Sequence, residues 1–235
     1  MTAEPNSTPR PVTIDIVSDV MCPWCFIGKR RLEKALALAA DVPVNIRWQP
    51  FQLDATLPSG GKDRQKYLDE KFGGPEKAEQ VYARIREAGD GENIPFAFDK
   101  ITRSPNTFDA HRLILWAEAG GHQDQIVEAL FQAYFIDGRD LTKTETLVAI
   151  GAAAGMDAKH LMMSLTSNRD KDTVSRALET ARSLGIYSVP SFIIDNRFLA
   201  QGAQPPEMLA DALRRAYADR LANHPDTKDA GSAFP

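Results

Sequence analysis

The hydrophobic positions near the N-terminus of the chain follow two different periods. Residues 12–17, VTIDIV, alternate apolar and polar side chains and are rich in β-branched residues, which is typical of a strand. Residues 28–40 contain strong helix formers and place Leu32 and Leu36 on one helical face. Alternation returns at residues 43–49, PVNIRWQ. The order strand, helix, strand predicts a parallel pair of strands joined by a crossover helix.

The long middle part of the chain, from about residue 62 to residue 184, has almost only helical periodicity. The predicted helices span 63–72, 75–89, 105–119, 122–136, 143–154, 157–166 and 170–184. Helix breakers and capping residues mark their ends. They are Gly73-Gly74-Pro75, Ser104-Pro105 as cap and first turn, Gly120-Gly121, and Thr142 with Glu145 as a capping box.

Strand patterning returns near the C-terminus. Residues 192–194 and 197–199 flank Asp195-Asn196, a dipeptide that favours a two-residue hairpin turn. A last amphipathic helix is predicted over 205–221. The chain is therefore predicted to be an α/β protein in which two sheet-forming segments flank a block of helices.

These patterns divide the chain into regions. We expect residues 12–61 and 185–221 to form one sheet-containing domain and residues 62–184 to form an all-helical insertion domain. Residues 1–11 and 222–235 are expected to be flexible termini.

Composition and charge narrow the range of partners. The 235 residues carry a net charge of −4 with a pI near 5.6, and no cluster of basic residues indicates a nucleic-acid partner. No apolar run approaches the roughly 20 residues that cross a bilayer, so no membrane partner is expected. The first residues, MTAEPNSTPRP, lack the pattern of a secretory signal, and we therefore expect a cytoplasmic location.

The two cysteines, Cys22 and Cys25, are separated by only two residues. In a reducing compartment such a pair is more often catalytic, redox-sensing or metal-binding than structural. A disulfide across so short a loop also contributes little stability. At a helix start, the unpaired backbone N–H groups favour a thiolate at Cys22, and Pro23 suits the first turn. We therefore expect Cys22 to be the catalytic nucleophile and Cys25 to close a redox-active Cys22–Cys25 disulfide.

A metal site is the main competing interpretation of the cysteine pair. A structural zinc ion needs about four ligands, and the chain has no second cysteine pair. Its histidines, which are His111, His122, His160 and His224, have no paired spacing. We therefore expect no metal and favour redox chemistry.

Several segments together resemble the FrnE-like branch of the DsbA family, in the thioredoxin superfamily. They are SDVMCPWCFIGKRRLEKAL, WQPFQLD, NTFDAHRL, LFQAYF, GIYSVPSFII and QGAQP, which occur in the family order. The resemblance covers most of residues 12–217. It implies a thioredoxin-like fold with a large helical insertion, acting on protein or small-molecule thiols and disulfides. We expect no cofactor, with glutathione as a candidate reductant.

The same resemblance gives a role to the Val189-Pro190 dipeptide. In this superfamily a cis proline faces the cysteine pair, so we expect a cis peptide bond before Pro190. Val189 is then expected to bind an extended substrate segment through its backbone, with Pro190 beside it. Trp24 is expected either to contact substrate or to pack on the insertion.

The resemblance also leaves two other functions open. Kappa-class glutathione transferases and 2-hydroxychromene-2-carboxylate isomerases share the fold, but they typically carry serine at the position of Cys22. The intact cysteine pair argues against their chemistry. The third hypothesis is a non-enzymatic holdase that grips unfolded segments. The sequence does not indicate the substrate, the redox direction or the oligomeric state.

One departure from the family pattern concerns the second thiol. Many related oxidoreductases have a buried acid six residues before the nucleophile, but here Ile16 occupies that position, and Asp15 should face the other side of the strand. Asp19 is a candidate substitute or a helix cap. His111 is a candidate cleft residue, although a structural role is favoured. The aromatic residues of LFQAYF are expected to be core.

Overall fold

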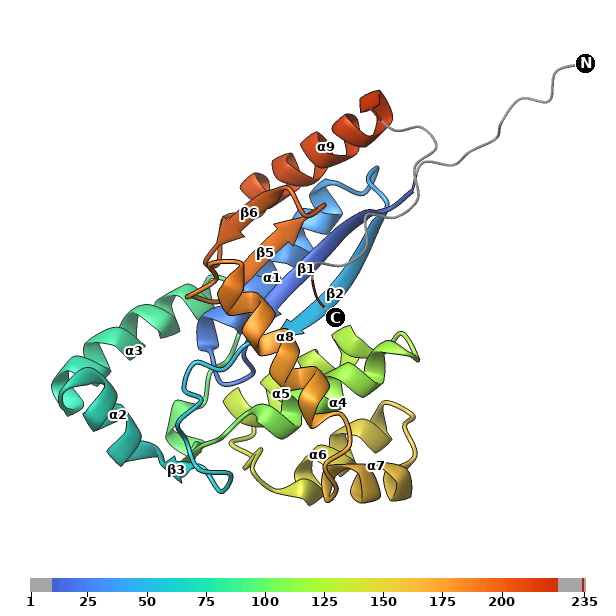
Figure 1. Ribbon diagram of the computed structural model, residues 1–235. Coiled ribbons are helices and arrows are strands. Elements are labelled where there is room, and N and C mark those ends of the chain that lie inside the picture. The colour runs from blue at the N-terminus through green and yellow to red at the C-terminus, as the bar shows by residue number, and fades with distance from the viewer. Residues whose placement is uncertain (1–9, 224–233, 235) are drawn as a thin grey trace, which may run out of the picture.

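The computed structural model describes residues 10–223 and residue 234, and its centre is a four-stranded sheet in the order β2-β1-β5-β6 (Figure 1). The strands are β1 (Val12–Ser18), β2 (Val44–Pro50), β5 (Ser191–Ile194) and β6 (Phe198–Gln201). Strand β1 runs parallel to β2 and antiparallel to β5, as the strand–helix–strand pattern predicts for the first pair. Every residue of β1 is buried, so it is the central strand of the core.

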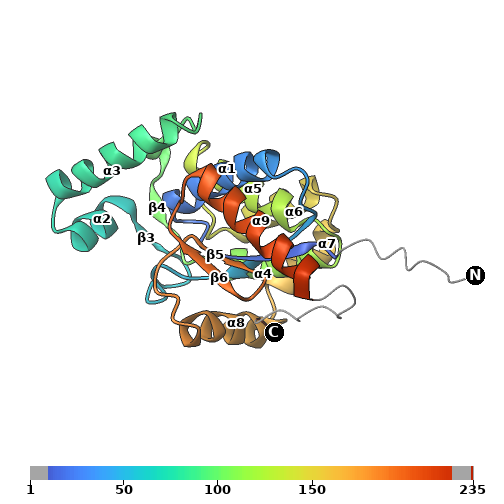
Figure 2. The same ribbon diagram turned by 90° about the horizontal axis from the view of Figure 1, so that it is seen from above.

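Helices cover both faces of this sheet (Figure 2). Helix α1 (Pro23–Leu38) and helix α9 (Pro206–Asn223) pack side by side on one face, and α8 (Lys171–Ser183) lies on the other. This is a thioredoxin-like α/β fold, and the two sheet-forming segments of the chain meet in it as predicted. The hairpin turn is also confirmed, since Asp195 and Asn196 both have positive φ angles, of 55° and 54°.

The middle of the chain forms the predicted helical block. Its elements are β3 (Lys62–Asp63), α2 (Arg64–Phe72), α3 (Pro75–Asp90), the short helix η1 (Phe98–Lys100), β4 (Arg103–Ser104), α4 (Phe108–Glu118), α5 (Gln123–Phe135), α6 (Thr144–Ala153), α7 (Ala158–Leu165) and α8. Strands β3 and β4 form a two-stranded ribbon that the periodicity did not predict.

Two predicted helix caps are wrong. Ser104 does not cap a helix, because it pairs with Lys62 in the ribbon and α4 begins only at Phe108. The capping box of Thr142 and Glu145 is also absent from the structure. The Thr142 hydroxyl donates to Asp140 at 2.7 Å, and α6 begins at Thr144 without a side-chain cap.

The helical block is joined to the sheet by aromatic packing and by charge. Phe26 of α1 stacks on Phe131 of α5 at 5.0 Å between ring centroids, and Phe135 and Tyr134 are buried next to them, so the LFQAYF aromatics are core as expected.

The division into two domains remains a prediction. Most residues of the predicted flexible termini lie outside the described residues; 222–223 belong to α9.

A buried lysine ties the same two helices together. The ammonium of Lys29, on α1, lies 2.5 Å from Glu33, 3.1 Å from Asp124 and 3.2 Å from Glu128. Burial lowers the pKa of Lys29, but the hydrogen bond to Glu33 and the three negative charges outweigh it and raise that pKa above its ordinary value. The start of α1 is therefore held against α5.

Candidate active site

The cysteine pair lies where β1 gives way to α1. Cys22 is the N-cap residue of α1 and Pro23 occupies the first helical position, as the sequence predicts. The Cys22 N–H donates to the Asp19 carbonyl at 3.0 Å, and the Cys25 N–H donates to the Cys22 carbonyl at 3.0 Å. Both cysteines are free thiols in this structure. One helical turn therefore brings the Cys22 and Cys25 side chains close together.

The Val189-Pro190 loop, far away in sequence, lies beside the first thiol. The peptide bond between the two residues is cis, as expected. The Cys22 thiol points at the Val189 carbonyl oxygen, with 3.7 Å between Sγ and O. The Pro190 carbonyl accepts a hydrogen bond from the Gly202 N–H at 2.7 Å, which fixes the loop to the end of β6. The structure therefore brings together three residues that the sequence singled out.

Gly28 allows this close approach, and sequence reasoning missed it. A Cβ atom on Gly28 would lie 2.7 Å from Cγ of Pro190 and 3.4 Å from the Phe192 ring. Helix α1 can therefore pack against the Pro190 loop only without a side chain at this position. The signal in the sequence was a glycine inside a helix, which is unfavourable by about 1 kcal/mol and usually has a packing reason.

The two thiols have different environments. Cys22 is 4% exposed and Cys25 is 1% exposed. Burial raises the pKa of the Cys25 thiol well above its ordinary value, and the neighbouring Cys22 raises it further. The Ser18 hydroxyl and the Asp19 backbone lower this pKa, but they do not cancel the effect of burial. Cys25 therefore holds its proton firmly in the reduced protein.

Asp19 fastens the loop that leads to the cysteines. Its carboxylate accepts hydrogen bonds from the Met21 N–H at 3.3 Å and from the Leu53 N–H at 2.7 Å. It does not cap α1, because the N-cap is Cys22 and no side chain caps that helix. The helix-cap interpretation is therefore wrong. The carboxylate instead connects the loop before Cys22 to the loop after β2.

His111 supports the same loop from α4. Its Nε2–H donates to the Phe51 carbonyl at 2.7 Å, and Nε2 lies 3.7 Å from Oδ1 of Asp19. The side chain is buried. These contacts agree with the structural role that the sequence favours for this residue.

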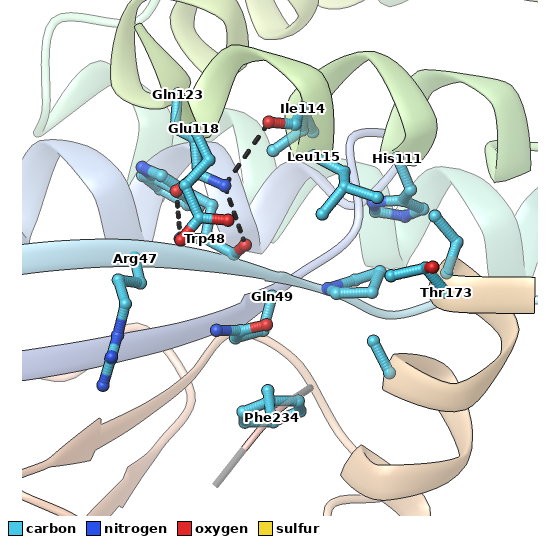
Figure 3. Close-up of a pocket in the computed structure, with 13 residues that line it drawn as sticks. Arg47, Trp48, Gln49, His111, Ile114, Leu115, Glu118, Gln123, Thr173 and Phe234 are labelled. Carbon is cyan, nitrogen blue, oxygen red and sulfur yellow. Dashed lines mark hydrogen bonds between the residues drawn. The ribbon is translucent and has the colours of Figure 1, made fainter. Parts of the chain in front are cut away.

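His111 also lines a pocket beside β2 (Figure 3). The pocket has a volume of about 230 Å³ and lies between β2, α4, α8 and Phe234. Neither cysteine lines it. On its wall, Gln123 accepts a hydrogen bond from the Trp48 N–H at 3.0 Å, and its amide donates to the Trp48 carbonyl at 3.5 Å. Gln123 thus satisfies backbone groups of the edge strand β2.

The insertion places buried tyrosines near the cysteines. Burial raises the pKa of Tyr67, on α2, to about 12, and the charge of Cys22 is among the nearby charges that raise it too. Burial also raises the pKa of Tyr82, on α3, which the charge of Cys22 raises as well. Both tyrosine hydroxyls therefore lie within electrostatic range of Cys22, and sequence reasoning missed them. Trp24 is 36% exposed at the start of α1.

Within residues 10–223 and 234, no group of three or more histidine, cysteine or acidic side chains could hold a metal ion. No helix in this part of the chain is long and apolar enough to cross a membrane.

A thioredoxin-like sheet, a Cys-x-x-Cys pair at the start of a helix and a facing cis proline define the class of thioredoxin-like proteins with a dithiol site. Residues 13–214 match the DSBA-like thioredoxin domain, so the chain belongs to that family. A curated relative, the uncharacterized protein YwbO of Bacillus subtilis, is 24% identical over 82% of this chain and 91% of its own length.

Solved structures agree with this assignment. A probable DsbA oxidoreductase from Streptomyces coelicolor is 29% identical, with a TM-score of 0.82 over 89% of this chain and 91% of that one. A 2-hydroxychromene-2-carboxylate isomerase is 17% identical, with a TM-score of 0.68 over 90% and 98%. The cytosolic disulfide reductase DsbM of Pseudomonas aeruginosa, solved with GSH, is 18% identical, with a TM-score of 0.59 over 89% and 99%. The last two similarities concern the fold alone.

Proposed function

We propose that the chain is a thiol–disulfide oxidoreductase, which exchanges disulfides through Cys22 and Cys25. The observation that carries this proposal is the placement of Cys22. It is the N-cap residue of α1, and its sulfur lies 3.7 Å from the Val189 carbonyl oxygen. Cys25 follows one turn later, within reach for a disulfide.

The proposed exchange proceeds in two steps. In the oxidising direction, a substrate thiolate attacks the Cys22 sulfur of the Cys22–Cys25 disulfide, and Cys25 leaves as a thiolate that takes up a proton. A second substrate thiolate attacks the substrate sulfur of the mixed disulfide and releases Cys22. The substrate loses two electrons and the cysteine pair gains them. The reverse steps reduce a substrate disulfide, and attack by Cys22 on a scrambled disulfide isomerises it.

The proposed substrates are small disulfides and extended polypeptide segments. Cys22 is only 4% exposed, so the surface of a folded protein has little access to its sulfur. The Val189 backbone N–H donates no hydrogen bond to another described residue, which leaves it available to a substrate carbonyl. An extended segment that paired with Val189 would lie beside the Cys22 sulfur.

The proposed location is the cytoplasm, with glutathione as a candidate reductant and with no resident cofactor. The location and the reductant are supported by the fold similarity to a reductase that is described as cytosolic and was solved with GSH. Glutathione would attack the Cys22 sulfur of the disulfide, because Cys22 is the more exposed of the two cysteines.

A mixed-disulfide trap tests the central proposal. Cys25→Ser removes the thiol that releases a substrate from Cys22, so we expect substrates to remain covalently attached to Cys22 and to be released by dithiothreitol. Cys22→Ser should trap none and should lose exchange activity. Exchange at the wild-type rate in Cys22→Ser would contradict the proposal.

A pair of exposed residues on α1 tests substrate binding. Trp24 and Leu38 are 36% and 49% exposed, so neither substitution by alanine should change the free energy of unfolding by more than about 0.5 kcal/mol. Trp24→Ala should raise KM for peptide disulfides, whereas Leu38→Ala, at the other end of the helix, should not. Equal KM values for the two variants would remove Trp24 from the substrate site.

The second candidate function is a glutathione-dependent isomerase or transferase of the 2-hydroxychromene-2-carboxylate isomerase or kappa-class type. The fold similarity to a solved isomerase and the narrow access to Cys22 favour it. Such chemistry needs a glutathione thiol but not a second cysteine. Glutathione-dependent isomerisation that survived in Cys25→Ser would support this candidate, and its loss would support the dithiol mechanism.

A further inference from the structure

The proposed exchange requires Cys25 to lose a proton inside the protein. Burial raises the pKa of this thiol, so its thiolate needs a stabilising group nearby. The side chain at position 16, which precedes Ser18 on the same face of β1, is the buried and apolar Ile16. Asp15 lies on the opposite face of β1, where its carboxylate accepts hydrogen bonds from Arg47 and Gln49. Neither position supplies a group to Cys25.

Ser18 is the next residue on the same face of β1 as Ile16, two positions closer to the cysteines. It is 5% exposed, and its Oγ is one of two buried side-chain polar atoms in the described residues without a hydrogen-bond partner. The other is Nε1 of Trp48. A buried hydroxyl without a partner costs about 1–3 kcal/mol, so such groups call for a functional explanation.

The thiol of Cys25 is the neighbour that gives this hydroxyl a role. Ser18 Oγ makes no hydrogen bond of ordinary geometry, yet it lies near enough to Cys25 to lower the pKa of that thiol. A hydroxyl can turn to donate its proton to a new acceptor. A thiolate at Cys25 would be such an acceptor, whereas the neutral thiol is a weak one.

We propose that Ser18 is a catalytic residue of the exchange reaction, whose buried hydroxyl donates a hydrogen bond to the Cys25 sulfur when that sulfur becomes a thiolate. This inference rests on the proposed function and adds a residue to its site. In the resolving step, the Cys25 thiol releases its proton to solvent and its sulfur attacks the Cys22 sulfur of a mixed disulfide. The bond between Cys22 and the substrate breaks, and the substrate leaves as a thiolate that takes up a proton.

Other titratable groups also face the cysteine pair. Asp19 precedes it, but its carboxylate is bound to the Met21 and Leu53 N–H groups, and His111 of α4 lies next to that carboxylate. Tyr67 of α2 and Tyr82 of α3 lie within electrostatic range of Cys22. A substitution at Ser18 removes none of these groups.

The experiment follows the reduced protein as it reacts with 5,5′-dithiobis(2-nitrobenzoate). Attack by Cys22 releases one thionitrobenzoate, and attack by Cys25 on the resulting mixed disulfide releases a second. Ser18→Ala should leave the first phase unchanged and slow the second by about tenfold at neutral pH, since a hydrogen bond to a charged group contributes about 1.5 kcal/mol or more. The pH profile of the second phase should also move to higher pH.

Matched variants separate the hydroxyl from the shape of the side chain. Ser18→Thr keeps the hydroxyl and adds a methyl group. Ser18→Val has the same shape as the threonine variant but carries a second methyl group in place of the hydroxyl. Only the valine variant should therefore slow the second phase. This pair also answers the question if Ser18→Ala does not fold. Ser164→Ala, which removes a buried hydroxyl in α7, should slow neither phase.

The outcomes distinguish this inference from the proposed function. A second phase that is unchanged in both Ser18→Ala and Ser18→Val would overturn the role of Ser18. Equal slowing in Ser18→Thr and Ser18→Val at every pH would also overturn it, because that result indicates packing alone. If the wild-type protein showed no first phase, that result would instead contradict the nucleophilic role of Cys22.

Discussion

The substitution Gly28→Ala tests how the Pro190 loop and the cysteine helix act together. The added Cβ would lie 2.7 Å from Cγ of Pro190, whereas carbon atoms in contact are about 3.5–4.0 Å apart. Helix and loop must therefore separate by about 0.8 Å or more. The proline ring cannot rotate away, and Phe192 lies behind it at 3.4 Å from the same Cβ position. The separation would therefore displace the loop beside Cys22.

Two opposing effects set the magnitude. Overpacking in a core costs about 1–3 kcal/mol, whereas alanine stabilises a helix interior by about 1 kcal/mol relative to glycine. We therefore expect the free energy of unfolding to fall by roughly 0–2 kcal/mol. The exchange rate should fall more steeply, by about tenfold to a hundredfold, because a shift near 1 Å between reacting groups has that effect.

The assay combines urea unfolding with the rate of disulfide exchange. Gly151→Ala is the matched control, since its Cβ would lie 2.4 Å from Cδ1 of Leu161, in the helical block. That variant should lose a similar amount of stability, yet exchange disulfides within about twofold of the wild-type rate. If Gly28→Ala kept the wild-type rate, or if both variants slowed equally, the contact with Pro190 would have no specific effect on the site.

Three further predictions concern stability. Asp19→Ala leaves the Met21 and Leu53 N–H groups without their acceptor and should lower the free energy of unfolding by about 2 kcal/mol, with a smaller loss in Asp19→Asn; equal stability of all three proteins in urea would contradict this. Lys29→Met should lower it by about 1–2 kcal/mol, because the three carboxylates around Lys29 are partly exposed and can be hydrated; denaturant titrations in which the variant matched the wild type would count against the clamp. Folding raises the pKa of Cys25. At a pH between the pKa of the unfolded state and that of the folded state, the folded protein therefore binds more protons than the unfolded protein. The stability of the reduced protein should therefore be complete below the ordinary cysteine value of about 9 and fall above it. The melting temperature of Cys25→Ala should fall less steeply above this pH than that of the reduced wild-type protein. Identical dependence on pH in the two proteins would refute this assignment.

The success of the sequence patterns depended on how many residues each element contains. Residues 12–17 and 43–49 were long enough for alternation to reveal two strands, and both are present with about those bounds. The ribbon of β3 and β4 has two residues in each strand, which is too short for any period. Ser104 pairs there with Lys62, and this tertiary pairing delays the start of α4.

The same limit applies to the site. Cys22 and Cys25 meet through one helical turn, so their spacing alone predicts their proximity. The contact between Cys22 and Val189 joins residues 167 positions apart, and only the family resemblance indicated it. The importance of Gly28 depends on an approach between two elements that no local pattern describes.

The unequal burial of the two thiols suggests which step controls the proposed reaction. Cys22 is at the cap of α1, beside the Val189-Pro190 loop, whose backbone is proposed to hold a substrate, so its sulfur is placed to attack a substrate disulfide. Cys25 lies one turn further along α1, and burial opposes its thiolate. In the proposed reaction we therefore expect a mixed disulfide to form at Cys22 more readily than Cys25 resolves it. A substrate that brings its own second thiol can leave without Cys25, whereas a substrate with one thiol must wait for it. The proton on Cys25 thus sets how long a substrate with one thiol stays bound, and the hydroxyl of Ser18 is placed to stabilise the thiolate that forms when this proton leaves.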